Sequence, residues 1–253
     1  MRHYQTVLQN MVSKNLEIKD LSVATREGKV VATDISISVG GGDIAVLMGP
    51  NGSGKSSVLN AVMGHPKYEI TAGSINLNGE DITAFNPEKK AKQGLFLSMQ
   101  HLPEISGVPL ASFLYQARKD LVGEEKNTLD FYKEAVNTAR EIGVPEEFLK
   151  RSVNKGLSGG EKKLSEMLQL AVLNPSIALL DEIDSGVDMD SMKKVFSAIK
   201  TLAEKGTGFL LVTHHPNILE YITPSMVYVM KEGKIVRSGG VEIIKELKEK
   251  GFE

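Results

Sequence analysis

The sequence predicts an α/β fold with a mainly parallel core sheet, an antiparallel β subdomain and an inserted helical subdomain. Three observations support this prediction. Continuous apolar runs recur along the chain, and such runs suit strands that are buried on both faces of a parallel sheet. Long helical patterns separate the runs, as they do in α/β proteins. An earlier segment alternates between apolar and polar residues, which is typical of half-buried antiparallel strands.

The alternating segment comes first in the chain, at residues 16–39. A turn at residues 26–29 interrupts it, so we expect two antiparallel strands joined by that turn. The continuous apolar runs follow at residues 44–48, 177–180 and 209–212. We expect these three runs to be buried strands of the α/β core.

Helical patterns dominate residues 103–155, where the sequence predicts helices without strands. The helices are expected at residues 110–118, 127–142 and 146–151. This region is therefore predicted to be a helical subdomain inserted into the core. The chain then ends with a short predicted hairpin over residues 227–237, followed by a polar helix whose charged run is a solvated face.

We expect one domain across residues 1–253. Residues 16–100 together with 156–253 are expected to form the α/β core with its β subdomain, and residues 101–155 the helical subdomain. No internal repeat or low-complexity segment suggests a further division of the chain.

The composition is that of an ordinary soluble globular protein, with 41% hydrophobic and 25% charged residues. The net charge of −2 offers no basic field, so no nucleic-acid partner is expected. No apolar run approaches the roughly 20 residues that span a bilayer, so we expect no direct membrane insertion. The absence of cysteine excludes disulfides and thiol catalysis and fits a cytoplasmic location.

A glycine-rich loop between the first apolar run and a helix predicts a phosphate site. Residues 49–56 match G-x-x-x-x-G-K-[ST] in full, between the strand and the helix that this motif requires. Backbone N–H groups and the helix dipole would face the phosphates, Lys55 would reach the β- and γ-phosphates, and Ser56 would reach Mg²⁺. A turn that binds nothing is the weaker interpretation. The expected nucleotide-binding residues here are Gly49, Pro50, Asn51, Gly52, Ser53, Gly54, Lys55, Ser56 and Ser57.

Four further side chains are predicted to complete a hydrolytic site. Asp181 ends the second apolar run and would hold Mg²⁺ through water, while Glu182 would be the general base. Gln100 would reach both the metal and the attacking water. His214 follows the third apolar run and would lie near the γ-phosphate. Taken alone, adjacent carboxylates are sometimes only a helix cap, and a lone histidine is usually structural.

A second anion site is predicted at Ser158-Gly159-Gly160, which precedes an apolar helix. Ser158 is a plausible N-cap, and the two glycines leave the helix N-terminus bare. The phosphate loop already cradles its own nucleotide, so this second site is free to receive the nucleotide of another copy. An ordinary capped helix is the alternative that spacing alone does not exclude.

These motifs, in this order, resemble the ABC ATPases over residues 16–237. The resemblance implies a P-loop NTPase of the ABC type that binds ATP and Mg²⁺ and hydrolyses ATP. It also implies an ATP-dependent head-to-tail dimer. ATP is held between the phosphate loop of one copy and the family signature, residues 157–161, of the other. Ser158 and Gly160 would then act in trans, and Asp188 would communicate across the interface.

Four stretches resemble one branch of that family, the SufC ATPases of Suf iron–sulfur cluster assembly. They are residues 181–188, 160–163, 100–108 and 64–68. The branch implies SufB/SufD-like scaffold subunits as partners, because a chain without cysteine cannot hold a cluster on thiolates. The alternative is the ATPase subunit of an ABC membrane transporter. A nucleotide-binding regulator with negligible turnover is disfavoured because Lys55 and Glu182 are both present.

The sequence departs from the family pattern in three places. Leu164 stands where an arginine usually follows the signature, and Ser106 replaces a usual proline. Residues 21–28 hold no aromatic residue that could stack on adenine, and Val23 or Val31 could offer only apolar contact to the base. None of these departures touches the predicted phosphate chemistry.

Overall fold

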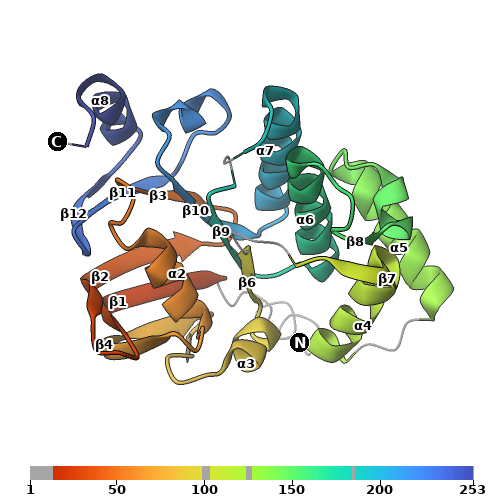
Figure 1. Cartoon of the computed structure of the whole chain (residues 1–253), viewed down its shortest axis with the longest axis horizontal. Coiled ribbons are helices and arrows are strands. Elements are labelled where there is room, and N and C mark those ends of the chain that lie inside the picture. Colours follow the sequence, from red (N-terminus) through yellow and green to blue (C-terminus); the bar gives the residue numbers. More distant parts are fainter. Residues whose placement is uncertain (1–13, 99–102, 124–126, 184–185, 253) are drawn as a thin grey trace, which may run out of the picture.

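The chain folds around a core sheet. The computed structural model describes residues 14–98, 103–123, 127–183 and 186–252. Within these residues six strands form the core sheet, in the order β12-β11-β3-β10-β9-β6, and only the β11–β12 pair is antiparallel (Figure 1). The predicted mainly parallel sheet is thus confirmed. The strands are β3 (Ile44–Met48), β6 (Leu95–Ser98), β9 (Ile177–Asp181), β10 (Gly208–Thr213), β11 (Met226–Lys231) and β12 (Lys234–Gly239).

The three apolar runs form β3, β9 and β10, and their side chains alternate between two hydrophobic clusters. In β10, Phe209 and Leu211 belong to the cluster on the helical side of the sheet. Leu210 and Val212 belong to the cluster on the opposite side. Because successive strand residues point to opposite faces, a strand covered on both faces must be apolar at every position.

A second, antiparallel sheet packs on one side of the core sheet, in the order β2-β1-β4-β5. Leu16 pairs with Val39 and Ile18 with Ile37, so the predicted hairpin is confirmed. Helix α2 (Lys55–Met63) shares a cluster with both sheets and lies on this side, while α6 (Gly159–Leu173) and α7 (Met189–Glu204) cover the other side (Figure 1). The strands are β1 (Asn15–Thr25), β2 (Val30–Gly40), β4 (Tyr68–Leu77) and β5 (Glu80–Asp81).

The predicted helical region contains α4 (Leu110–Val122), α5 (Thr128–Glu141) and the 3₁₀ helix η1 (Glu146–Lys150). The prediction that it holds no strands is wrong. Strand β7 (Ile105–Pro109) pairs with β8 (Ser152–Val153), and Leu110 N donates to Arg151 O at 2.9 Å. The two strands lie near the two ends of the region, where the chain enters and leaves it. Their pairing satisfies backbone N–H and C=O groups of both segments. A two-residue strand is too short to show a periodic pattern.

The remaining elements complete the described chain. They are α3 (Pro87–Lys92), η2 (Pro216–Glu220) and α8 (Glu242–Lys250). The predicted hairpin near the end of the chain and the polar helix after it are confirmed as β11–β12 and α8. Among the described residues, no helix is both long enough and apolar enough to cross a membrane.

A fully buried lysine supports the helix that follows the phosphate loop. Lys90 in α3 is 0% exposed, and its Nζ donates to Val62 O at 2.7 Å, near the end of α2. A cation favours that end of a helix, where carbonyl groups concentrate negative charge. Burial nevertheless disfavours the charged form and lowers the pKa of Lys90 to about 8.

We expect this lysine to make the stability of the protein increase with pH between about 8 and 10.5. Above pH 8 the folded protein loses the Lys90 proton, while the unfolded chain keeps it until pH approaches 10.5. Unfolding therefore takes up protons, and the free energy of unfolding rises by roughly 1–3 kcal/mol over this window. Urea unfolding at several pH values measures it, with Lys90→Met as the variant that lacks the increment. Parallel pH profiles for both proteins would contradict the assignment.

Candidate nucleotide site

The phosphate loop folds as a turn between β3 and α2 that only glycine permits at two points. A Cβ atom at Gly49 would lie 2.1 Å from Met230 O, and one at Gly54 would lie 2.7 Å from Val31 O. Gly54 also has a φ of 105° and occupies the N-cap position of α2 without a side-chain cap. The first N–H groups of α2 are therefore available to an anion.

Lys55 lies over this loop with its ammonium group held by backbone carbonyls. Nζ donates to Gly49 O at 2.8 Å and to Pro50 O at 2.9 Å, and the residue is only 5% exposed. Burial lowers the pKa of Lys55, and the nearby Glu182 and Asp181 carboxylates offset part of that shift. A phosphate group at the loop would add negative charge to this desolvated cation and favour its protonated form.

Ser56 and Asp181 come together as predicted for a magnesium site. Ser56 Oγ donates to Asp181 Oδ1 at 3.0 Å, across the gap between α2 and the end of β9. Asp181 is 2% exposed, and burial is the main cause of its raised pKa. One hydroxyl and one carboxylate fit Mg²⁺, which is usually bound by few protein oxygens together with water and phosphate. A bound Mg²⁺ would favour the ionised form of Asp181.

Glu182 and His214 also meet at this end of the sheet. The distance from His214 Nδ1 to Glu182 Oε1 is 3.7 Å, and Glu182 N donates to Val212 O at 3.0 Å. Glu182 has a φ of 48°, a left-handed conformation that costs a non-glycine residue on the order of 1 kcal/mol or more. Buried His214 Nδ1 has no hydrogen-bond partner within the described part of the chain. A carboxylate beside an imidazole suits proton transfer to or from a reacting water.

A cavity of about 440 Å³ runs from Glu182 past the phosphate loop to the start of β2. Val31 lines it, whereas Val23 is fully buried in the core and cannot reach a bound base. Of the two valines that the sequence suggested, only Val31 remains a candidate. Two charged lining residues had not been anticipated, Lys29 and Glu232. Glu232 belongs to a turn far from the motif in sequence, so no motif pattern pointed to it.

The second predicted anion site forms a separate unit at the N-terminus of α6. Ser158 Oγ accepts from Glu161 N at 3.3 Å and Glu161 Oε2 accepts from Ser158 N at 2.8 Å, which confirms the predicted cap. A Cβ atom at Gly160 would lie 2.3 Å from Ser191 Oγ, and one at Gly159 would lie 2.7 Å from Gly186 O. The signature glycines therefore pack directly against the segment that leads into α7.

Asp188 caps α7 beside these glycines. Its Oδ1 accepts from Ser191 N at 2.9 Å and its Oδ2 from Ser191 Oγ at 2.7 Å, and these bonds lower the pKa of Asp188. Neither Asp188 nor the signature residues line the cavity described above. One copy of the chain thus brings together Lys55, Ser56 and Glu182 around that cavity but leaves the signature outside it.

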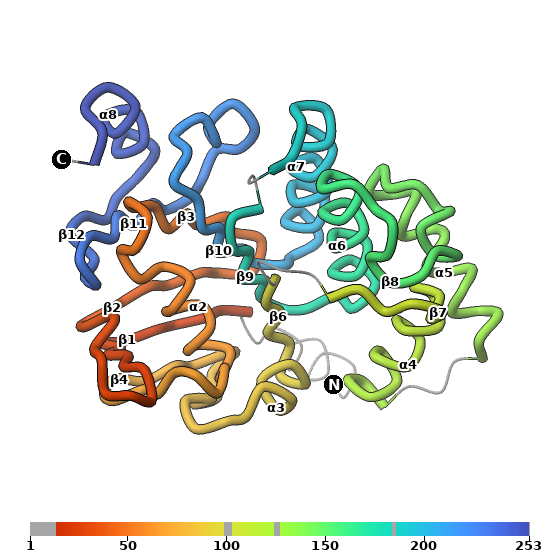
Figure 2. Tube along the Cα trace, in the orientation of Figure 1, coloured from red at the N-terminus to blue at the C-terminus, as the bar shows by residue number. Residues whose placement is uncertain are grey.

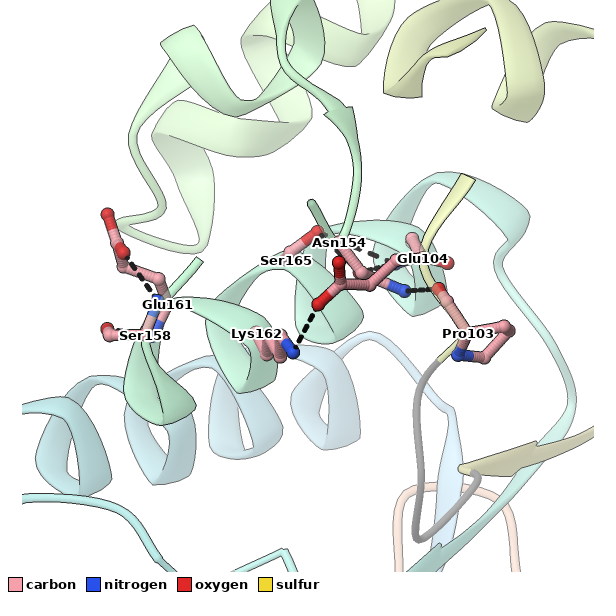
Figure 3. A network of polar contacts seen from close by, with 8 residues as sticks. Pro103, Glu104, Asn154, Ser158, Glu161, Lys162 and Ser165 are labelled. Atoms are coloured by element: carbon pink, nitrogen blue, oxygen red, sulfur yellow. Dashed lines mark hydrogen bonds and ion pairs between the residues drawn. The ribbon is translucent and has the colours of Figure 1, made fainter. Parts of the chain in front are cut away.

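Polar contacts join the signature helix α6, and the turn before it, to the segment that follows Gln100 (Figure 3). Gln100 itself lies outside the described residues. Lys162 Nζ binds Glu104 Oε1 at 2.8 Å, and Asn154 Nδ2 donates to Pro103 O at 3.0 Å. The next residue of α6, buried Lys163, pairs with Glu166 at 3.3 Å. The sequence analysis did not identify these pairs, although Lys163 and Glu166 have the i, i+3 spacing of neighbours on a helix.

Comparisons with known proteins agree with this geometry. The family model described as ABC transporter matches residues 32–185. The Bacillus subtilis (strain 168) protein named Vegetative protein 296 is 42% identical over 246 residues, which cover 96% of this chain and 94% of that protein. A nucleotide-free ATP-binding cassette from an ABC transporter is similar in structure, with a TM-score of 0.77, 26% identity, and coverage of 94% of this chain and 95% of that one.

A further solved structure, a dimeric ATP-binding cassette bound to ADP and Pi, shares the fold at 19% identity. Its TM-score is 0.76, and the match covers 89% of this chain and 98% of that one. Residues 32–185, which match the family model, hold the phosphate loop, the signature and the acidic pair.

Proposed function

The chain belongs to the ABC transporter family, whose ATP-binding domains hydrolyse ATP, and from this premise we propose that it powers a Suf-type iron–sulfur cluster assembly complex. ATP closes two copies head to tail, and this closure rearranges SufB/SufD-like scaffold subunits. The sequence holds no cysteine, so the scaffold and not this chain supplies thiolates to the cluster.

The contact between Glu104 and Lys162 is the observation that carries the proposed partner. Each residue lies in a stretch that resembles SufC, residues 100–108 and 160–163, and the two residues are 58 positions apart in the chain. The contact joins the stretches at the surface, where Ile105 is 36% exposed. Two stretches that resemble SufC and are distant in sequence thus lie side by side at the surface. This arrangement supports a single docking face for the scaffold at residues 103–108 and 160–163.

Hydrolysis is an in-line attack of water on the γ-phosphate, assisted mainly by positioning and electrostatics. Lys55 and the N–H groups of the loop hold the phosphates, and Glu182 orients the water and accepts its proton. His214 lies beside Glu182 and faces the γ-phosphate. Ser56 and Asp181 would hold Mg²⁺, which would neutralise part of the phosphate charge. Gln100 is assigned to the metal and the water from its place in the sequence, directly after the apolar segment 94–99, and from the family resemblance.

The second copy completes each site through its signature. Ser158, Gly159 and Gly160 present a helix N-terminus to the γ-phosphate of the other copy, and Asp188 faces the shared interface. Their position outside the cavity of their own chain supports this role. The helix dipole and the N–H groups of Gly159 and Gly160, which the Ser158 cap does not occupy, favour the phosphate charge.

The alternative is the ATPase subunit of an ABC membrane transporter. The family model is described as ABC transporter, and one similar solved cassette comes from a transporter. The alternative requires the same phosphate chemistry and the same dimer. It differs only in the partner that the closing dimer moves.

Pull-down of the tagged chain from native extract distinguishes these partners. We expect capture of water-soluble proteins that hold a reconstituted iron–sulfur cluster, identified by mass spectrometry and by the visible absorption of the cluster. Polytopic membrane proteins as the stoichiometric partners would instead establish the transporter role.

Two matched variants test the docking face. Ile105→Glu adds a charge to the exposed β7 strand and should abolish capture, because a desolvated charge opposes docking. Val236→Glu adds the same charge to β12, where the side chain is 53% exposed, and should leave capture unchanged. Equal capture by both variants would remove β7 from the proposed face.

A further inference from the structure

The end of the cavity away from the phosphate loop has no aromatic side chain among its lining residues. Val30 and Val31 offer an apolar surface there, and Lys29 and Glu232 are the charged groups beside it. Val30 is 60% exposed. This end is therefore suited to a flat apolar ring with polar atoms at its edge, which describes a nucleobase.

Glu232 reaches the cavity from the two-residue turn between β11 and β12, a hairpin that lies beside β2 (Figures 1 and 2). Glu232 has a φ of 51° and Gly233 a φ of 79°, and the two positive values are those of a type I′ turn. The backbone of this turn thus fixes the direction in which the Glu232 side chain leaves the chain.

Backbone hydrogen bonds fasten the same turn to the phosphate loop and to β2. Gly233 N donates to Ser53 O at 3.0 Å, and Thr33 N donates to Gly233 O at 2.8 Å. A Cβ atom at Gly49 would lie 2.1 Å from Met230 O, so the strand before the turn also packs against the loop. These bonds anchor the backbone next to Glu232 beside the phosphate loop.

The Glu232 carboxylate has no structural partner within the described ranges. No hydrogen bond or ion pair of this side chain forms among those residues, unlike Glu161 and Asp188, which cap helices. The only other carboxylate among the residues described as lining the cavity is Glu182, which lies at the opposite end, beside His214. Glu232 is an exposed residue at the rim of the cavity, so its carboxylate is accessible to a ligand bound there.

We propose that Glu232 reads the base of the nucleotide by accepting a hydrogen bond from the 6-amino group of adenine. Val31 contacts the ring face, and the carboxylate accepts at the ring edge, where a charged acceptor strengthens the bond. A 6-oxo group at the same position would present a second acceptor to the carboxylate and be disfavoured. This inference rests on the proposed use of ATP and adds the residue that selects it.

The test compares four ligands by equilibrium binding: ATP, purine riboside triphosphate (which lacks the 6-amino group), inosine triphosphate and inorganic tripolyphosphate. The wild type should bind ATP about three- to tenfold more tightly than purine riboside triphosphate, as expected for one partly exposed hydrogen bond to a charged group. Inosine triphosphate should bind no better than purine riboside triphosphate.

The variant Glu232→Gly removes the side chain where glycine accepts the backbone conformation without strain. It should bind ATP and purine riboside triphosphate equally, with tripolyphosphate binding unchanged. Glu232→Gln, which keeps an acceptor oxygen, should restore part of the preference for ATP. Glu27→Gly is the matched control, because Glu27 lies in another turn and does not line the cavity.

An unchanged ratio of ATP to purine riboside triphosphate in Glu232→Gly would overturn the inference, and so would an equal loss of affinity for both. Failure of the proposed function looks different. If the wild type bound neither ATP nor tripolyphosphate, the phosphate site itself would be misassigned.

Discussion

Lys55→Ala is expected to abolish nucleotide binding, with the ATP dissociation constant rising by about 100-fold or more. Lys55 is the buried cation at the phosphate loop, held 2.8 Å from Gly49 O and 2.9 Å from Pro50 O. Its removal leaves phosphate charge without a partner in a desolvated site, which costs roughly 3–5 kcal/mol. Titration calorimetry with ATP and Mg²⁺ measures the loss.

Two controls separate lost binding from lost folding. Lys67→Ala removes an exposed lysine near the other end of α2 and should bind ATP like the wild type. Thermal unfolding of Lys55→Ala should remain cooperative. An Lys55→Ala protein that bound ATP within threefold of the wild type would show that this loop is not the phosphate site.

Glu182→Gln should keep ATP bound while hydrolysis falls by about 100-fold or more, the usual contribution of a general base. Glutamine has the same shape, so ATP binding persists, but it cannot accept the proton of the attacking water. With ATP trapped, we expect the two copies to stay together as a stable dimer. Single-turnover hydrolysis and light scattering with ATP and Mg²⁺ measure these two effects.

Glu204→Gln makes the same change on α7, away from the cavity, and should leave hydrolysis unaltered. Wild-type hydrolysis by Glu182→Gln would mean that another group activates the water. Loss of ATP binding by Glu182→Gln would also contradict the assignment of Glu182 as the general base, because it would show that Glu182 binds ATP.

The core strands could be predicted from the sequence because a strand that is buried on both faces is apolar at every position. Each apolar run became a strand whose alternate residues, such as Leu210 and Leu211, enter opposite clusters. The hairpin of β1 and β2 was likewise predictable from its alternation. By contrast, β7 and β8 are paired by the meeting of two chain segments, and no local pattern encodes that meeting.

The parts of the candidate site that belong to a sequence motif could be predicted. The parts that depend on contacts between segments distant in sequence could not. The contact of Ser56 with Asp181 follows from a loop and a strand end that share one edge of the sheet. The burial of Val23 depends on which face of β1 meets the core, and the left-handed backbone of Glu182 depends on its bond to Val212 O. The arrival of Glu232 at the cavity depends on bonds to Ser53 and Thr33 made by its neighbour Gly233.

The strand order also constrains how the chain can be made. Strand β3 carries the phosphate loop, yet its two neighbours in the sheet, β10 and β11, are translated much later. During synthesis on the ribosome, β3 has no backbone partners until residues 208–213 and then 226–231 have emerged. Such late, long-range pairing slows folding. A nascent chain therefore completes its nucleotide site only when synthesis is nearly finished, and premature release leaves β3 as an unpaired apolar strand that favours aggregation.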